Sequence, residues 1–284
     1  MSPTGKSAMQ RHDDYETEIF DRGLAFDLST LMERRTLLRL AGITGLLAIA
    51  GCASDVVPAS TTSTGAGVTS AAAGGVVCDV IPEETAGPFP GDGSNGPDVL
   101  AESGIVRSDI TSSFGSSTTV AAGVPLTLKL RILDNAAGCA PLAGAAVYAW
   151  HCDREGRYSM YSDGVTNENY LRGVQEADAD DTVTFTSIFP ACYPGRWPHA
   201  HFEVYASLAD ATGGADPIAT SQLAFPEDVS NEVYATAGYE QSVANLAELS
   251  LESDMVFADG ADRQLGVMGG TIAGGLTVDL AVPV

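Results

Sequence analysis

The sequence predicts a mainly β fold, an antiparallel β-sandwich in a single domain with few short helices. Short stretches alternate apolar and polar residues, which is the period-2 pattern of half-buried strands. Gly, Pro, Asn and Asp separate these stretches as turn residues. Helical periodicity is poor, and no second core is evident. Many short strands with frequent turns are typical of a sandwich or barrel.

The first expected strand, 124–132, places Val, Leu and Ile on one face and Thr, Lys and Arg on the other. Further apolar stretches bounded by turn residues predict five more strands, at 145–152, 182–189, 199–205, 218–225 and 276–282. The best helix candidate is 240–251.

The N-terminal region divides into three parts before the expected domain at 78–284. Residues 1–31 are interpreted as a non-native or unstructured extension, because their acidic residues do not fit the start of an export signal, and translation is expected to begin at Met32. Residues 32–52 combine an arginine pair, a short apolar stretch and Cys52, which resembles a twin-arginine signal with a lipoprotein cleavage site. Residues 53–77 have the composition of a flexible linker. The protein is thus expected to be exported, extracellular or held at the cell surface through a lipid on Cys52.

The chain is strongly acidic, with 14 Lys and Arg against 37 Asp and Glu and a net charge of -23. Binding of nucleic acid or of an anionic membrane surface requires the opposite charge balance. Neither is therefore expected as a partner.

Four cysteines besides Cys52 fit an oxidising compartment, and two disulfides are expected among them. Four cysteines allow three pairings, and the sequence does not choose between them. The pairing of Cys152 with Cys192, and hence of Cys78 with Cys139, is favoured. No CxxC spacing is present, so a zinc site is disfavoured.

The run 193–201 carries the strongest chemical pattern. His199 and His201 are two residues apart in an expected strand, so both imidazoles point to one face. Ala200, Phe202 and Val204 then form the opposite, apolar face. This strand is predicted to be core on one side and a metal site on the other.

Two tyrosines accompany the histidines, Tyr158 after a glycine-containing turn and Tyr193 just before the histidine strand. Both lie at strand ends or loops, where functional side chains concentrate. Phenolate is a hard oxygen ligand, and phenolates with imidazoles suit Fe(III) better than zinc or copper. His151 is expected to face away from this site, because Trp150 and Cys152 face the other way.

The stretch 85–228 resembles the intradiol ring-cleavage dioxygenases, in particular secreted proteins related to catechol and protocatechuate dioxygenases. The resemblance lies in Gly87-Pro88-Phe89, the strand 124–134, the segment 150–158, the segment 190–201 and Gln222. It implies a mononuclear non-haem Fe(III) held by Tyr158, Tyr193, His199 and His201. Tyr193 would leave the metal when substrate binds, and Arg196 and Gln222 would stabilise negative charge on the substrate ring.

The resemblance implies a catalytic domain that inserts both atoms of O2 into a small aromatic diol. The ring would open between its two hydroxyl-bearing carbons to a cis,cis-muconate-type product. Two alternatives remain: a lipid-anchored β-sandwich binding module with a vestigial metal site, and a hydrolytic or oxidative site with copper or zinc. The physiological catechol and the oligomeric state do not follow from the sequence. The tail from Val229 onward matches no element of the family.

Overall fold

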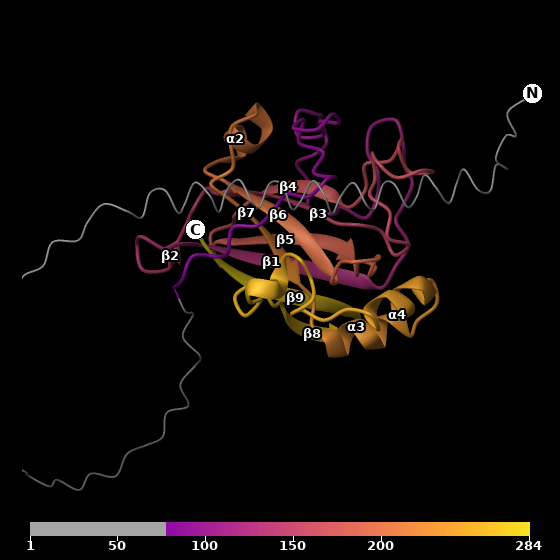
Figure 1. Ribbon diagram of the computed structural model, residues 1–284. Helices are drawn as coiled ribbons and strands as arrows, with labels where there is room; N and C mark the ends of the chain where they lie inside the picture. Colours follow the sequence, from indigo (N-terminus) through magenta and orange to yellow (C-terminus); the bar gives the residue numbers. More distant parts are fainter. Residues whose placement is uncertain (1–77) are drawn as a thin grey trace, which may run out of the picture.

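The computed structural model describes residues 78–284, so the expected extension, export signal, Cys52 and linker lie outside the described residues. Two sheets pack face to face (Figure 1). The five-stranded sheet contains β1 (Pro125–Asp134), β2 (Ala140–Pro141), β5 (Thr182–Ile188), β8 (Val267–Thr271) and β9 (Gly275–Pro283). The four-stranded sheet has the order β4 (Arg172–Glu176), β3 (Ala146–Trp150), β6 (His199–Tyr205) and β7 (Ala219–Ala224).

The main core lies between the sheets and follows the strand alternation. On β1, Leu126, Leu128 and Leu130 point inward, and on β6 the inward residues include Phe202 and Val204. Each such buried side chain stabilises the fold by roughly 1.5–3 kcal/mol. The predicted mainly β sandwich is confirmed.

The strand pairs are antiparallel with one exception, since β1 and β9 run parallel with Leu126 opposite Leu276. The prediction of antiparallel pairing is therefore wrong for β1 and β9. The strands β4 and β8 were not expected, because their sequences contain Gly173 and the Gly269-Gly270 pair and show no clear alternation. Strand order depends on contacts between distant parts of the chain, which local patterns do not report.

Short helices follow β6 and β7: α2 (Leu208–Gly213), α3 (Glu227–Tyr234), α4 (Glu240–Leu246) and a 3-10 turn (Phe257–Asp259). The expected helix 240–251 is present but ends at Leu246. Figure 1 shows α3 and α4 together at one end of the sandwich. Within residues 78–284, no helix is long and apolar enough to cross a membrane.

The outer face of the four-stranded sheet is also covered. The segment before β1 packs Val99 and Ile105 against Tyr148 and Trp150 of β3. The buried guanidinium of Arg172 holds this segment in place by donating hydrogen bonds to the carbonyl oxygens of residues 89 and 90. Every residue of β6 is consequently buried, and its polar side chains lie in a space sheltered from water.

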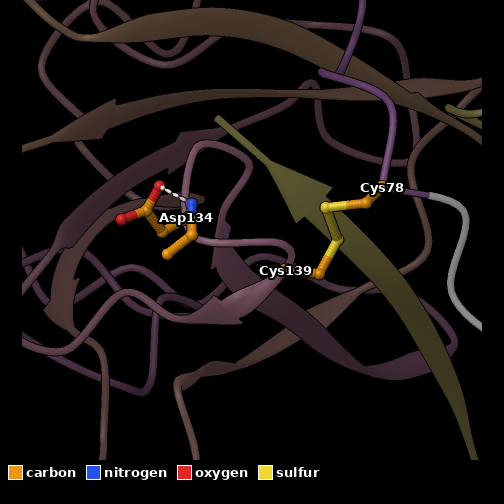
Figure 2. The surroundings of a disulfide bond; sticks show 4 residues. Cys78, Asp134 and Cys139 are labelled. Carbon is orange, nitrogen blue, oxygen red and sulfur yellow. Dashed lines mark hydrogen bonds between the residues drawn. A yellow bond between two sulfur atoms is a disulfide. The ribbon is translucent and has the colours of Figure 1, made fainter.

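A disulfide joins Cys78 to Cys139, which precedes β2 (Figure 2). The favoured pairing is thereby confirmed for these two residues but is wrong for Cys152 and Cys192, which are free and buried. The reason is the direction of the two thiols. Cys152 directs its sulfur toward the carbonyl oxygen of Ala191 at 3.7 Å, whereas Cys192 directs its sulfur toward that of Arg196 at 3.5 Å.

Cys78→Ser/Cys139→Ser is expected to lower the free energy of unfolding by about 4 kcal/mol, because the bond closes a long loop in the unfolded chain. The two cysteines are 61 residues apart in sequence. Urea unfolding with and without reductant measures the effect: the reductant should destabilise the wild type and leave the variant unchanged. Equal unfolding free energies for wild type and variant under oxidising conditions would contradict this contribution.

Candidate metal centre

Tyr158 reaches the site through a tight turn that follows β3. The carboxylate of Asp153 accepts hydrogen bonds from the backbone N–H groups of Glu155 and Arg157 and fixes this turn. Gly156 has φ +85°, a conformation that L side chains rarely adopt, and a Cβ there would lie 3.2 Å from that of Tyr193. The glycine therefore lets the two tyrosine-bearing loops approach each other.

The histidines occupy the outer face of β6, as the alternation predicted, while Ala200 and Phe202 point into the main core. His199 donates from Nδ1 to the carbonyl oxygen of Trp197 at 2.5 Å, which leaves Nε2 as the ring's acceptor atom. His201 stacks on Trp150 with ring centroids 4.9 Å apart. Both imidazoles are thus held with Nε2 directed toward the same space.

The four expected ligand atoms meet there. Nε2 of His199 lies 3.2 Å from Oη of Tyr193, 3.4 Å from Oη of Tyr158 and 3.2 Å from Nε2 of His201. The two tyrosine oxygens are 3.5 Å apart. Two ligands that each lie about 2 Å from one metal ion are separated by roughly 3–3.5 Å, so the spacing fits a single ion.

The protonation states also fit a metal. Burial lowers the pKa of His199 and of His201 well below the usual value, with a further contribution from the charge of Arg196, so both imidazoles are neutral, as metal binding requires. Burial and the neighbouring Tyr193 raise the pKa of Tyr158. A cation at the centre would offset this penalty and favour phenolate, as coordinated ions do.

The donor set is unusual because it depends on tyrosine. Among residues 78–284, no group of three or more His, Cys, Asp and Glu is placed to hold a metal ion. Nδ1 of His201 is buried without a hydrogen-bond partner there, so the fixed position of that ring comes from stacking on Trp150. Two phenol oxygens and two imidazole nitrogens fit a hard trivalent ion such as Fe(III).

Arg196 and Gln222 lie beside these four residues, and both are buried. Arg196 donates from Nη2 to Oε1 of Gln222 at 2.6 Å, and Gln222 donates from Nε2 to the carbonyl oxygen of Thr85 at 2.8 Å. Burial opposes the charge of Arg196, but the nearby Tyr193 and Asp254 outweigh it and raise the pKa. The structure therefore brings all six expected residues together, and one of them, Arg196, is permanently charged.

A cavity of about 460 Å³ opens beside this cluster. Its wall includes Phe89 and Tyr161, polar side chains such as Gln241, and Tyr193. Tyr193 is the only one of the four expected ligands in this wall, and it is also less buried than the other three. Of these four residues, Tyr193 is therefore the one exposed to the cavity.

The sequence did not predict the residues of the C-terminal segment that hold the loop between β5 and β6 through hydrogen bonds. Ser242 accepts a hydrogen bond from the N–H of Cys192, and Asn245 donates one to the Cys192 carbonyl oxygen. Asp254 accepts from Nε of Arg196 at 3.0 Å and from the N–H of Trp197 at 2.6 Å. No local pattern marks them, since polar residues in short helices and turns are common.

His151 faces away from the cluster, as expected. Its Nδ1 donates to the carbonyl oxygen of Cys152 at 2.8 Å, and its Nε2 lies 2.7 Å from Oγ of Ser187 in the opposite sheet. Burial lowers its pKa from 6.5 to about 4. The ring is therefore a neutral, hydrogen-bonded group between the sheets.

This histidine predicts a pH dependence of stability. Its pKa is lower in the folded state than in the unfolded state, so acid favours unfolding. The contribution is intact above about pH 6.5 and up to about 3 kcal/mol is lost as the pH falls to about 4. The variant His151→Gln should lose less stability between pH 7 and 4.5 in urea unfolding. An identical loss in wild type and variant would contradict the prediction.

The comparisons with known proteins agree with this geometry. A family model described as Dioxygenase matches residues 95–213. The structure titled intradiol ring-cleavage dioxygenase from Tetranychus urticae has 26% identity and a TM-score of 0.54, covering 64% of this chain and 87% of that chain. The dioxygenase domain of a dioxygenase carbohydrate-binding protein fusion from Streptomyces sp. SirexAA-E has 23% identity and a TM-score of 0.46, covering 72% of this chain and 98% of that chain.

The curated proteins contain no match to the chain. The similarity to dioxygenases rests on the family model, which ends before β7, and on the structure from Tetranychus urticae. The mainly β architecture agrees with that fold. Over residues 95–213 the chain is therefore similar to the dioxygenases, and its fold is similar to that of the intradiol ring-cleavage dioxygenase from Tetranychus urticae.

Proposed function

We propose that this protein is an exported Fe(III)-dependent enzyme that cleaves a catechol-type ring between its hydroxylated carbons. The observation that carries the proposal is the convergence of four side chains: Nε2 of His199 lies 3.2–3.4 Å from the donor atoms of Tyr158, Tyr193 and His201. The two tyrosine oxygens are 3.5 Å apart. Export is supported by the signal-like segment ending at Cys52 and by the Cys78–Cys139 disulfide, because such bonds persist in oxidising compartments.

The four residues would hold a mononuclear non-haem Fe(III), which would supply a Lewis acid that activates the diol toward O2. Tyr193 lines the cavity, so its phenolate oxygen can accept the proton that an incoming hydroxyl group releases. Tyr158 and the two histidines are almost fully buried and would stay in place.

Arg196 and Gln222 would act on the bound substrate. The buried guanidinium lies close enough to both tyrosines to interact with them electrostatically, so it can offset negative charge that develops on the ring. Gln222 holds one edge of the guanidinium and is itself fixed by the segment before β1. Both side chains are sheltered from water, where such interactions are strongest.

In the proposed reaction, one carbon–carbon bond of the ring breaks and each of the two carbons gains one oxygen atom from O2. The product is a dicarboxylic acid of the cis,cis-muconate type. No external reductant is needed, because the two electron pairs come from the catechol. A binding module without turnover, the alternative considered from the sequence, would not require a guanidinium buried beside the two tyrosines.

The experiment loads the protein with iron and follows O2 uptake with catechol, protocatechuate, hydroxyquinol and caffeate. Mass spectrometry under ¹⁸O2 is expected to show a product that contains both labelled atoms. Zinc-loaded protein serves as the control and should be inactive. Iron-loaded protein that binds these diols without consuming O2 would instead favour the binding module.

A further inference from the structure

Arg196 lies on the loop between β5 and β6, which lacks regular secondary structure at this residue. A long arginine side chain has many rotamers, and an electrostatic catalyst is effective only when its charge is held in place beforehand. The hydrogen bonds that restrict the guanidinium therefore matter to the proposed reaction, on which this inference rests.

Asp254 supplies one of those restraints from the C-terminal segment, beyond the residues that the family model matches. Its side chain is completely buried. One oxygen, Oδ2, accepts from Nε of Arg196 at 3.0 Å and from the N–H of Trp197 at 2.6 Å. The other, Oδ1, accepts from the N–H groups of Val256 and Phe257 at 2.8 and 3.2 Å.

The two oxygens therefore have different tasks. Oδ1 shapes the turn in which Asp254 itself lies, while Oδ2 connects that turn to the loop between β5 and β6. On the other side of the guanidinium, Gln222 accepts from Nη2 at 2.6 Å. Restraints on Nε and Nη2 define the orientation of a planar group, because two of its three nitrogen atoms are then tied.

The backbone partners of Asp254, namely the N–H groups of Trp197, Val256 and Phe257, shape the two segments. The bond to Nε of Arg196 stabilises the buried carboxylate and, together with Gln222 on Nη2, also fixes the orientation of the guanidinium. We propose that Asp254 is the positioning residue for Arg196 and acts on ring cleavage through the orientation of that guanidinium.

The variant Asp254→Asn separates the two tasks. Asparagine offers one acceptor oxygen where aspartate offers two, so it can keep the turn or the link to Arg196 but not both. With iron bound, the variant is expected to keep the visible absorption band and a KM within about threefold, while kcat falls about 30- to 100-fold. The control Asp262→Asn removes the same charge from an exposed position of the same segment and should leave kcat unchanged.

A double-variant comparison shows whether Asp254 acts through Arg196. In an Arg196→Ala background, Asp254→Asn should cause no further loss of kcat, because the group that it positions is absent. A further loss of the same size in that background would overturn the proposal.

A second measurement is independent of iron and turnover. In metal-free protein labelled with ¹⁵N, the Nε–H signal of Arg196, assigned by its loss in Arg196→Lys, should exchange with water about tenfold faster in Asp254→Asn than in wild type. Asp262→Asn should match the wild type. Unchanged exchange in Asp254→Asn would overturn the proposal.

The outcomes distinguish this inference from the proposed function. A wild-type protein that cleaves no catechol contradicts the proposed function, and the exchange measurement then decides the role of Asp254 alone. Wild-type turnover with unimpaired Asp254→Asn overturns only the positioning role. An Asp254→Asn protein that fails to fold or to retain iron makes Asp254 a structural residue and also overturns it.

Discussion

Tyr158→Phe and His199→Ala are each expected to lose iron and to lower catechol turnover by more than about a hundredfold. Substitution of a residue that only supports a metal ligand already costs 10- to 100-fold in affinity or activity, and removal of a ligand itself should exceed this. Iron content by mass spectrometry and O2 uptake measure the two effects. The result follows from the position of both side chains among the four convergent donors.

The matched control is Tyr234→Phe, which removes a phenol oxygen that donates to the carbonyl oxygen of Pro190 at 3.1 Å, away from the four donors. This variant should retain iron and turnover. If Tyr158→Phe kept a full complement of iron, Tyr158 would not be a ligand, and the centre would have to be assembled from other groups.

Arg196→Ala is expected to keep the metal centre and its colour but to lower kcat about 100- to 1000-fold. Removal of one preorganised donor from a buried site has an effect of this size in other enzymes. The substitution also leaves the carboxylate of Asp254 buried without its cation, so the free energy of unfolding should fall by roughly 3–5 kcal/mol. Steady-state kinetics and thermal unfolding of the iron-loaded variant test both effects.

Arg196→Lys is the informative comparison. Lysine restores the charge but cannot reproduce the planar contacts that Nε and Nη2 make with Asp254 and Gln222. It should recover most of the stability and only part of kcat. Normal turnover in Arg196→Ala would mean that the guanidinium has no catalytic role.

Much of the centre was predictable because it depends on local geometry. His199 and His201 share a face since side chains alternate along a strand, and the apolar Ala200 and Phe202 decided which face is core. The same alternation placed His151 away from the site. Tyr158 was expected as a metal ligand from the resemblance. Its distance from His199 depends on how the loop after β3 folds back, which the local sequence does not determine.

The parts that were missed depend on contacts between distant segments. Nothing in the sequence around Asp254 indicates that it meets Arg196, which is 58 residues away. The parallel pairing of β1 with β9 likewise joins residues far apart in the chain. The even number of cysteines suggested that Cys152 and Cys192 form a disulfide. The direction of each thiol, however, follows from backbone geometry that their positions in the sequence do not reveal.

The most direct test of the iron site is the visible spectrum of purified, metal-replete protein together with its metal content. Two tyrosine ligands to Fe(III) predict about one iron per chain and a burgundy colour with a broad band that shifts when catechol is added. A colourless protein that contains zinc and no iron, and whose spectrum is unchanged by catechol, would contradict the account.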